Sequence, residues 1–540
     1  MARPMPEPAP VTRATLDDDV VVMTTAAARR GPARRATISA MHADEDLDVL
    51  VIGAGLSGIA AGYHLQRRLP HLRYAILEAR AAIGGTWDLF RYPGVRSDSD
   101  MYTLGYSFAP WPSAQAIADG ASIRAYIEST ARSHGIDRHI RFDHRVVAAR
   151  WSSEAARWSV EVVRADGTTC TLRARFLFAC SGYYAYDAGY TPAFAGTSDF
   201  AGRIVHPQQW PSDLDVRGQR VVVIGSGATA VTLVPALVQQ GARVTMLQRS
   251  PTYVASLPAV DPIARLLRRV LPDGPAHDLI RWKNVSLSNA FYTFCRRFPG
   301  PARRWLERGV AQQLGDADAV ARHFHPRYDP WDQRLCLVPD GDLFKVVRAG
   351  QAEVVTDEIV RFTRSGLALR SGQVLDADVV VTATGLRIQL FGGARLEVDG
   401  RVVDPSTLHV YKGAMFSDVP NFAFAMGYTN ASWTLKTELI ARYVCRLLAH
   451  LEDQGQAWCV ARAPADVGDE PVIDFQSGYV QRALPGLPRQ GRRVPWRLYQ
   501  NYLRDSIMLR WRRLDDPALE FGRPLPVSAA ASAAAGSARR

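Results

Sequence analysis

The chain has 540 residues and a mass of 59.5 kDa, too much for one hydrophobic core, so two or three domains are expected. A composition that is 47% hydrophobic and 22% charged is that of a soluble globular protein, and no apolar run approaches the roughly 20 residues of a membrane-spanning helix. The net charge of +12 is compatible with a nucleic-acid partner, but arginine is spread along the whole chain, so none is expected.

The cysteines indicate a reducing compartment. They stand singly, with no C-x-x-C pair, at Cys170, Cys180, Cys295, Cys336, Cys445 and Cys459. This spacing argues against a disulfide framework and against a dithiol redox centre. Together with the lack of an export signal, it predicts a cytoplasmic protein.

Both ends of the chain are predicted to be disordered. Residues 1–45 are rich in Ala, Arg and Pro without periodicity, and residues 521–540 form a tail of small residues. Neither segment has a face that it can bury in a core.

The first ordered stretch, "DVLVIGAGLSGIAAGYHL" (48–65), has the pattern of a strand, a glycine-rich turn and a helix. Gly53 permits a tight turn, Gly55 lets the backbone approach a pyrophosphate, and Gly58 lets the helix pack on the strand. Glu78 ends the second strand, "YAILEA", where its carboxylate can accept hydrogen bonds from ribose hydroxyls. Residues 46–195 are therefore predicted to be the first part of a dinucleotide-binding domain.

The pattern recurs at "RVVVIGSGATAVTLVPAL" (220–237), with Gly225, Gly227 and Ala230 at the corresponding positions. Its second strand ends in Gln248 and Arg249 instead of a carboxylate. An arginine binds the 2′-phosphate of NADPH, and a charge-assisted hydrogen bond contributes about 1.5–3 kcal/mol, or one to two decades of affinity. Residues 196–385 are thus predicted to bind NADPH. With a second dinucleotide on the chain, hydride transfer to FAD is the simplest interpretation.

Residues 255–325 interrupt this α/β rhythm and are predicted to form a helical insert. "IARLLRRVL" and "ARRWLERGVAQQL" have the pattern of basic amphipathic helices. Such helices usually cover a domain surface; weak peripheral attachment to an acidic membrane is the alternative. A strand at "DADVVVTATGL" (376–386) closes the second unit, and residues 386–520 are predicted to complete the first domain. Two histidines in "HFHPRYD" (323–329) lack further ligands, so no metal site is expected.

Two further motifs carry a family resemblance. "GGTWDLFRYPGVRSDSDMY" (84–102) contains G-x-W-x-x-x-x-Y-P-G-x-x-x-D, and "FAGRIVHPQQWP" (200–211) contains F-x-G-x-x-x-H-x-x-x-W-P. Together they resemble the Baeyer–Villiger monooxygenases, within the class B flavin monooxygenases, and within that family the ethionamide monooxygenase type is the most similar. The resemblance covers about residues 46–515. It implies an α/β fold with two Rossmann-like dinucleotide-binding domains, for FAD and NADPH, the second inserted into the first.

The resemblance also implies the chemistry. NADPH reduces FAD, dioxygen forms a C4a-(hydro)peroxyflavin, and this oxidises a small-molecule ketone to an ester or lactone, or an organosulfur compound at sulfur. Arg334 is expected to stabilise the anionic oxygen and Asp98 to orient Arg334. The further residues expected at the cofactors are Gly85, Thr86, Trp87, Asp98, Tyr102, Ser250 and Thr384. Gln333 departs from the lysine that many family members have, which leaves more of the phosphate recognition to Arg249.

The resemblance places the 200–211 motif on a linker. Phe200 and Trp210 are expected to anchor a hinge, Gly202 to allow its bend, and His206 to hydrogen-bond across the joint. A catalytic role for His206 stays open. So do two other activities, a flavin monooxygenase restricted to nitrogen or sulfur and a non-oxygenating NADPH:acceptor reductase; the pair Trp210-Pro211 favours carbonyl chemistry. The loop "GYTNASWT" (427–434) offers Asn430 and Trp433 as candidates for the substrate pocket. The sequence does not predict the physiological substrate or the oligomeric state.

Overall fold

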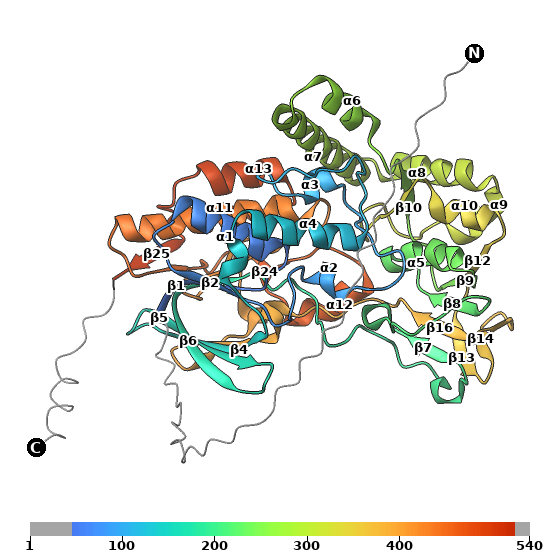
Figure 1. Cartoon of the computed structure of the whole chain (residues 1–540), viewed down its shortest axis with the longest axis horizontal. Coiled ribbons are helices and arrows are strands. Elements are labelled where there is room, and N and C mark those ends of the chain that lie inside the picture. Colours follow the sequence, from blue (N-terminus) through green and yellow to red (C-terminus); the bar gives the residue numbers. More distant parts are fainter. Residues whose placement is uncertain (1–45, 524–540) are drawn as a thin grey trace, which may run out of the picture. The chain divides into compact units, whose positions relative to one another are not determined.

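The computed structural model describes residues 46–523, in which helices cover two large sheets and several small ones lie beside them (Figure 1). The first sheet contains β1 (Asp46–Ile52), β2 (Tyr74–Leu77), β3 (Ile140–Arg141), β4 (His144–Ser152), β5 (Arg157–Arg164), β6 (Thr169–Ala179), β17 (Arg395–Val398), β18 (Arg401–Val402) and β21 (Phe422–Phe424). Their order is β18-β17-β4-β5-β6-β1-β2-β3, and β21 also pairs with β6. Strands β21, β6, β1, β2 and β3 are parallel, as βαβ connections require.

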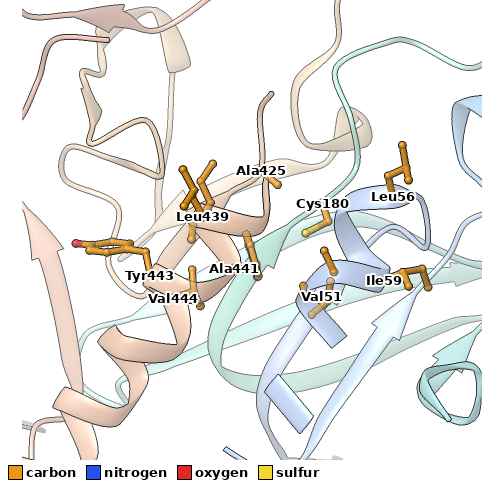
Figure 2. Packing of buried hydrophobic residues seen from close by; sticks show 14 of the residues in the cluster. Val51, Leu56, Ile59, Cys180, Ala425, Leu439, Ala441, Tyr443 and Val444 are labelled. Atoms are coloured by element: carbon orange, nitrogen blue, oxygen red, sulfur yellow. The ribbon is translucent and has the colours of Figure 1, made fainter. Parts of the chain in front are cut away.

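Helices cover one face of the first sheet. They include α1 (Leu56–Arg68), α2 (Thr86–Leu89), α3 (Met101–Leu104), α4 (Gly120–Ser133) and α11 (Trp433–Asp453). Figure 2 shows Val51 of β1 close to Ile59 of α1, with Leu439 and Val444 of α11 in the same core. The central strand is buried on both faces, which explains its continuous apolar run. This core holds α1, and with it the first glycine-rich turn, against β1.

The second sheet is entirely parallel. It contains β7 (Arg203–Val205), β8 (Arg220–Ile224), β9 (Arg243–Gln248), β12 (Ala352–Thr356) and β16 (Val379–Thr382), in the order β12-β9-β8-β16-β7. Helices α5 (Ala228–Gln239) and α10 (Asp342–Arg348) pack on one face, and the small sheet β13 (Ile359–Thr363), β14 (Gly366–Leu369) and β15 (Val374–Asp376) lies next to the core of the other. Since β17 and β21 return to the first sheet, the second sheet is an insertion into the first, and the predicted fold class is confirmed.

The helical insert is connected by two paired strands to the second sheet and its covering helices, which we call the second unit. Strand β10 (Val254–Leu257) runs parallel to β11 (Cys336–Pro339), and between them lie α6 (Pro262–Val270), α7 (Asp273–Arg297), α8 (Pro299–Leu314) and α9 (Ala317–His323). Asp261 caps α6 by accepting hydrogen bonds from the amides of Ile263 and Ala264. The helices therefore occupy the segment in which the α/β rhythm of the sequence breaks.

The last part of the chain covers the first sheet with short elements. They are β19 (Val410–Tyr411), β20 (Met415–Phe416), β22 (Trp458–Ala461), β23 (Glu470–Pro471), β24 (Arg489–Gln490), β25 (Leu519–Gly522), α12 (Gly478–Ala483), α13 (Tyr502–Ser506) and the π-helix η7 (Ile507–Trp511). The prediction of a disordered tail from residue 521 is wrong by three residues, because Phe521 and Gly522 pair with β22. The predicted disorder of residues 1–45 and 524–540 lies outside the described residues.

The described residues include no helix that is long and apolar enough to cross a membrane. All six cysteines lie within residues 46–523 and none forms a disulfide.

Candidate active site

One large cavity runs between the two sheets. Its volume is about 1160 Å³, and residues from both glycine-rich turns line it. Among the predicted site residues, the following lie in its wall: Gly53, Gly55, Glu78, Gly85, Thr86, Trp87, Asp98, Gly225, Gly227, Arg249, Ser250, Arg334 and Thr384. Ordinary small-molecule sites have volumes of about 300–1,000 Å³, so this cavity is large enough for more than one ligand.

The first glycine-rich turn connects β1 to α1. Gly53 has φ +99°, a conformation that favours glycine, and it begins the turn. A Cβ atom on Gly58 would lie 1.8 Å from the carbonyl oxygen of Gly53, so only glycine allows α1 to pack this closely. Gly55 is the N-cap of α1, and both Gly55 and Leu56, the first residue of the helix, line the cavity. The amides of the first helical turn therefore face a site suited to an anion.

Glu78 is almost fully buried beside this turn. Its two carboxylate oxygens accept hydrogen bonds from the amides of Ala54, at 2.7 Å, and Arg80, at 3.0 Å. Burial raises the pKa of Glu78, while the two amides and the charge of Arg80 oppose that rise. The bond to Ala54 shows that Glu78 also holds the glycine-rich turn in place, a role that the sequence did not suggest.

The second turn connects β8 to α5. Gly227 is the N-cap of α5, and a Cβ atom there would meet no atom within 4 Å. Ala230 is fully buried in α5, at the position where the first turn has Gly58. Arg249 follows β9 and is exposed at the cavity, whereas Gln248 is buried and donates to the carbonyl oxygen of His323. The cationic side chain is thus the one placed to meet a ligand.

Arg334 and Asp98 form an ion pair in the cavity. Nε of Arg334 lies 2.6 Å from Oδ2 of Asp98, and about a third of each side chain is exposed, 31% and 30%. Burial works to lower the pKa of Arg334, but the charge of Asp98 and three nearby tyrosine hydroxyls together raise it above the ordinary value. The guanidinium therefore stays charged at any working pH.

The loop that carries Asp98 is fixed to the second unit. Tyr92 is buried in the core of the second sheet. Gly94 packs against α5, where a Cβ atom would lie 2.5 Å from the carbonyl oxygen of Thr232. Arg96 forms an ion pair with Asp342 of α10 at 2.6 Å. The tyrosine and glycine of the 84–102 motif thus place Asp98 where it meets Arg334.

Comparison with known proteins gives the family. The model of the flavin-binding monooxygenase-like family matches residues 47–261. The chain is 55% identical over 486 residues to the FAD-containing monooxygenase EthA of Mycobacterium tuberculosis, covering 89% of this chain and 99% of that protein. It is 49% identical over 485 residues to the putative FAD-containing monooxygenase MymA of the same species, covering 88% and 98%. The chain is a flavin-binding monooxygenase.

The fold agrees with this family. A solved structure described as oxidized steroid monooxygenase bound to NADP matches with a TM-score of 0.68 at 24% identity, over 88% of this chain and 100% of that chain. A cyclohexanone monooxygenase with bound ε-caprolactone matches with a TM-score of 0.66 at 20% identity, again over 88% and 100%. The family expected from the two sequence motifs is confirmed, and the fold is that of its Baeyer–Villiger members.

In this monooxygenase a group of aromatic side chains surrounds Arg334. The hydroxyls of Tyr183 and Tyr184 lie 2.6 Å apart, and the ring of Tyr183 stacks on Trp433 at 5.1 Å. Tyr479 lines the same wall, and burial raises the pKa of all three tyrosines. Sequence reasoning had named only Trp433 here; the run "SGYYAYD" (181–187), directly after β6, was the available signal for the others.

Asp357 is a further residue of the cavity that the sequence analysis did not predict. Strand β12 runs beside β9 with Thr356 opposite Gln248, so Asp357 leaves the sheet next to Arg249. Both residues line the cavity. The oxygens of Asp357 accept hydrogen bonds from the amides of Glu358 and Ser371, and the contact with Ser371 is the largest cause that lowers its pKa. A carboxylate thus shares the end of the sheet with the predicted phosphate-binding arginine.

Tyr102 does not line the cavity. It is buried in the core of the first unit, where the guanidinium of Arg268 lies over its ring at 5.2 Å. Its backbone carbonyl accepts a hydrogen bond from Arg281 of α7. The prediction that the Tyr102 side chain contacts a cofactor is therefore wrong, because α3 turns the side chain toward the helical insert. Asn430, a candidate for the substrate pocket, instead donates to the carbonyl oxygen of Gln500 in a separate small pocket.

The 200–211 segment of the monooxygenase is more than a connector, since Arg203–Val205 form the edge strand β7. Phe200 is buried in one core of the second unit, and Trp210 packs against the other. Gly202 has no left-handed φ, so it does not act through a bend. A Cβ atom there would lie 2.3 Å from the carbonyl oxygen of Asp378, and close approach of the two strands is what requires glycine.

His206 joins the two crossings between the sheets. Its Nε2 donates to the carbonyl oxygen of Gly385 at 3.2 Å, while Nδ1 accepts from the amide of Gln208. Burial lowers the pKa of His206, although the bond to Gly385 opposes this. The outgoing and returning segments also pair directly, through Tyr190 to Gly385 and Ala185 to Arg387. His206 is absent from the cavity wall.

The histidines of "HFHPRYD" have ordinary partners. His323 contacts the hydroxyl of Thr356 at 2.8 Å, and His325 pairs with Glu307 at 2.7 Å. Within residues 46–523, no group of three or more His, Cys, Asp or Glu side chains is placed to hold a metal ion.

Proposed function

We propose that the chain is an FAD-dependent monooxygenase that consumes NADPH and O2, inserts one oxygen atom into ketones to give esters or lactones, and also oxidises sulfides or thioamides. The reaction is balanced when ketone, O2, NADPH and a proton give ester, NADP⁺ and water. The observation that carries the proposal is the Arg334–Asp98 ion pair, in a cavity that both glycine-rich turns line.

The residues present fit the two cofactors. Neither α1 nor α5 has a side-chain cap at its N-terminus in the described structure, so the amides of both first turns are available to phosphate oxygens. Glu78 suits the ribose of FAD, and Arg249 suits the 2′-phosphate of NADPH. Since both turns border one cavity, the two cofactors would approach each other in it.

Arg334 is suited to hold an anionic oxygen. Bound FAD supplies hydride acceptance and oxygen activation. A fixed positive charge about 4 Å from an anion stabilises it by about 4 kcal/mol at an effective dielectric constant of 20. Asp98 pairs with Nε of Arg334 and so fixes the plane of the guanidinium. Arg334 itself lines the cavity, where a ligand can meet its charge. In this proposal Arg334 is the catalytic residue and Asp98 positions it.

A small apolar slot beside Arg334 has room for one small group and gives the main cavity an apolar wall. Its volume is about 30 Å³, and it shares Tyr183, Arg334, Tyr428, Trp433 and Tyr479 with the main cavity. Most of its other lining residues are apolar: Val410, Phe424, Met426, Val472, Ile473, Phe475, Val480 and Leu498. The second cation of the lining, Lys436, is paired with Asp505 at 2.6 Å. Apolar walls next to Arg334 suit a carbonyl or sulfur group that carries hydrocarbon substituents.

The test measures how oxygen and NADPH are used. We expect the holoenzyme to convert an aliphatic ketone to its ester with most of the NADPH consumption coupled to product. Arg334→Ala should keep bound FAD and NADPH oxidation but lower ester formation by about 100-fold to 1,000-fold, the usual cost of removing an oxyanion partner. Asp98→Asn should give a smaller loss, because the charge of Arg334 remains while its orientation is weakened. Ester, hydrogen peroxide and NADPH are quantified in the same reactions.

Other outcomes separate the alternatives. Sulfide oxidation without any ester would indicate a monooxygenase restricted to heteroatoms. NADPH oxidation that yields only hydrogen peroxide with every ketone and sulfide would indicate a reductase. Full ester formation by Arg334→Ala would refute the role given to the guanidinium.

A further inference from the structure

Helix α6 presents its apolar side to solvent. Ile263, Leu266 and Val270 lie on one face of the helix, at spacings of three and four residues, and are 51%, 59% and 65% exposed. On the inner side, the guanidinium of Arg268 donates to the backbone carbonyls of Trp111, Pro112 and Ser113. Ala264 and Leu267 also pack against the first core. The helix is thus attached through Arg268 and two apolar residues, while its other apolar side chains, Ile263, Leu266 and Val270, stay exposed.

The exposed apolar side chains continue along the neighbouring helices. On α7, between α7 and α8, and on α8 they are Leu279, Trp282, Leu287, Phe294, Phe298 and Trp305. Figure 1 shows α6 and α7 together at the upper edge of the view. All of these residues belong to the helical insert.

A second segment extends the surface from the far end of the chain. Leu503, Ile507 and Trp511 of α13 and η7 recur every four residues and are exposed, Trp511 by 78%. The ring of Tyr502 lies 5.8 Å from that of Trp282, and Asn501 donates to Asn289 of α7. We call the exposed apolar residues of α6, α7, α8, α13 and η7, with the arginines among them, the apolar–basic face.

The charge of this face is positive. The helical insert, residues 255–325, contains eleven basic and six acidic side chains, a net charge of +5. Exposed arginines lie among the apolar residues: Arg265, Arg269, Arg297, Arg304, Arg308, Arg504 and Arg512.

We propose that the apolar–basic face binds the surface of an anionic phospholipid bilayer. Outward apolar side chains flanked by arginine are the signature of a helix that lies in the membrane interface, with tryptophan at the headgroup level. A nucleic-acid surface would need the cations but would leave the leucines and tryptophans exposed to water. Contact with a second copy of this chain would bring two positive surfaces together. The inference does not depend on the reaction proposed above.

The test uses the full-length FAD-loaded protein and two kinds of vesicle. One is made of phosphatidylcholine alone and the other of phosphatidylcholine with one third phosphatidylglycerol. We expect the protein to sediment with the anionic vesicles and the bound fraction to fall as salt is raised. Leu266→Gln combined with Trp282→Gln should weaken binding at least tenfold, and Arg265→Gln combined with Arg269→Gln should weaken it on anionic vesicles only.

Val360→Gln and Val402→Gln are matched controls, because both valines are similarly exposed but lie on β13 and β18, away from this face. They should bind vesicles like the unmodified protein. Bound FAD and activity on a water-soluble ketone report that each variant is folded. Failure of the unmodified protein to sediment with either vesicle would overturn the proposal. So would a dimer in solution that the Leu266/Trp282 variant converts to a monomer, since that result would assign the face to self-association.

Discussion

At the scale of single residues, the site depends on how each charge is held. Arg334 is kept charged by Asp98 despite partial burial, and Glu78 is fixed by two backbone amides beside the first turn. Arg249 differs, because it is exposed at the cavity and shares the end of its sheet with Asp357. A neighbouring carboxylate opposes a bound phosphate, so the preference for NADPH depends on how strongly Arg249 outweighs it.

Arg249→Ala should therefore raise the KM for NADPH by about tenfold to 100-fold, with little change for NADH, because one charge-assisted contact is lost. Arg243→Ala is the matched control, since Arg243 lies at the other end of β9 and does not line the cavity. Steady-state kinetics with both nucleotides measure the ratio. An unchanged preference would show that Arg249 does not contact the 2′-phosphate.

At the scale of elements, the second sheet is connected to the first by two crossings that are tied together. His206 bridges the outgoing strand β7 and the returning segment at Gly385. Its ring packs against Gly189, where a Cβ atom would lie 1.9 Å from Cε1. The histidine is thus enclosed between the crossings and away from the cavity, which favours a structural role over a catalytic one.

His206→Ala should keep stoichiometric FAD but slow flavin reduction by NADPH, or divert NADPH oxidation to hydrogen peroxide, because the crossing loses its bond to Gly385. Stopped-flow reduction and product coupling measure the two effects. His206→Asn, which can still donate to the carbonyl, should retain more of the reduction rate. Fully coupled activity in His206→Ala would contradict the proposal that His206 holds the two crossings together.

At the scale of the whole molecule, folding buries several histidines in their neutral form. His64 in α1 is nearly inaccessible; burial first, then the charges of Arg442, Arg68 and Arg510, lower its pKa well below 6.5. Burial also lowers the pKa of His206 and of His277. Below pH 6.5 the unfolded chain binds protons that the folded chain excludes, so stability is present above that pH and decreases as the pH falls.

The free energy of unfolding should therefore fall between pH 7 and pH 5, by up to about 1.4 kcal/mol per pH unit for each histidine that stays neutral in the folded state. Urea unfolding at pH 5, 6, 7 and 8 measures the slope. His64→Gln should reduce it, while Val402→Gln should not, because Val402 is 60% exposed and does not titrate. A stability that is flat or rises toward acid would contradict the buried neutral state.

The sequence by itself determined the parts that depend on short-range geometry. The glycine-rich turns at 53–58 and 225–230, the carboxylate at Glu78 and the arginine at Arg249 were predicted because turn sterics and the 20-residue spacing of a βαβ unit are local. The two motifs predicted the family, and the resemblance that they carry implied the insertion of one domain into the other. The pairing of Arg334 with Asp98 was expected only through the resemblance.

Only the tertiary structure decided which residues far apart in the chain meet. It showed the aromatic group around Arg334, the carboxylate of Asp357 beside Arg249, and the burial of Tyr102 away from the cavity. It also showed that Gly202 allows two strands to approach and that α6 leaves Ile263, Leu266 and Val270 exposed. An amphipathic pattern indicates that a helix has an apolar and a polar side. Which side faces water depends on what the rest of the chain packs against the helix.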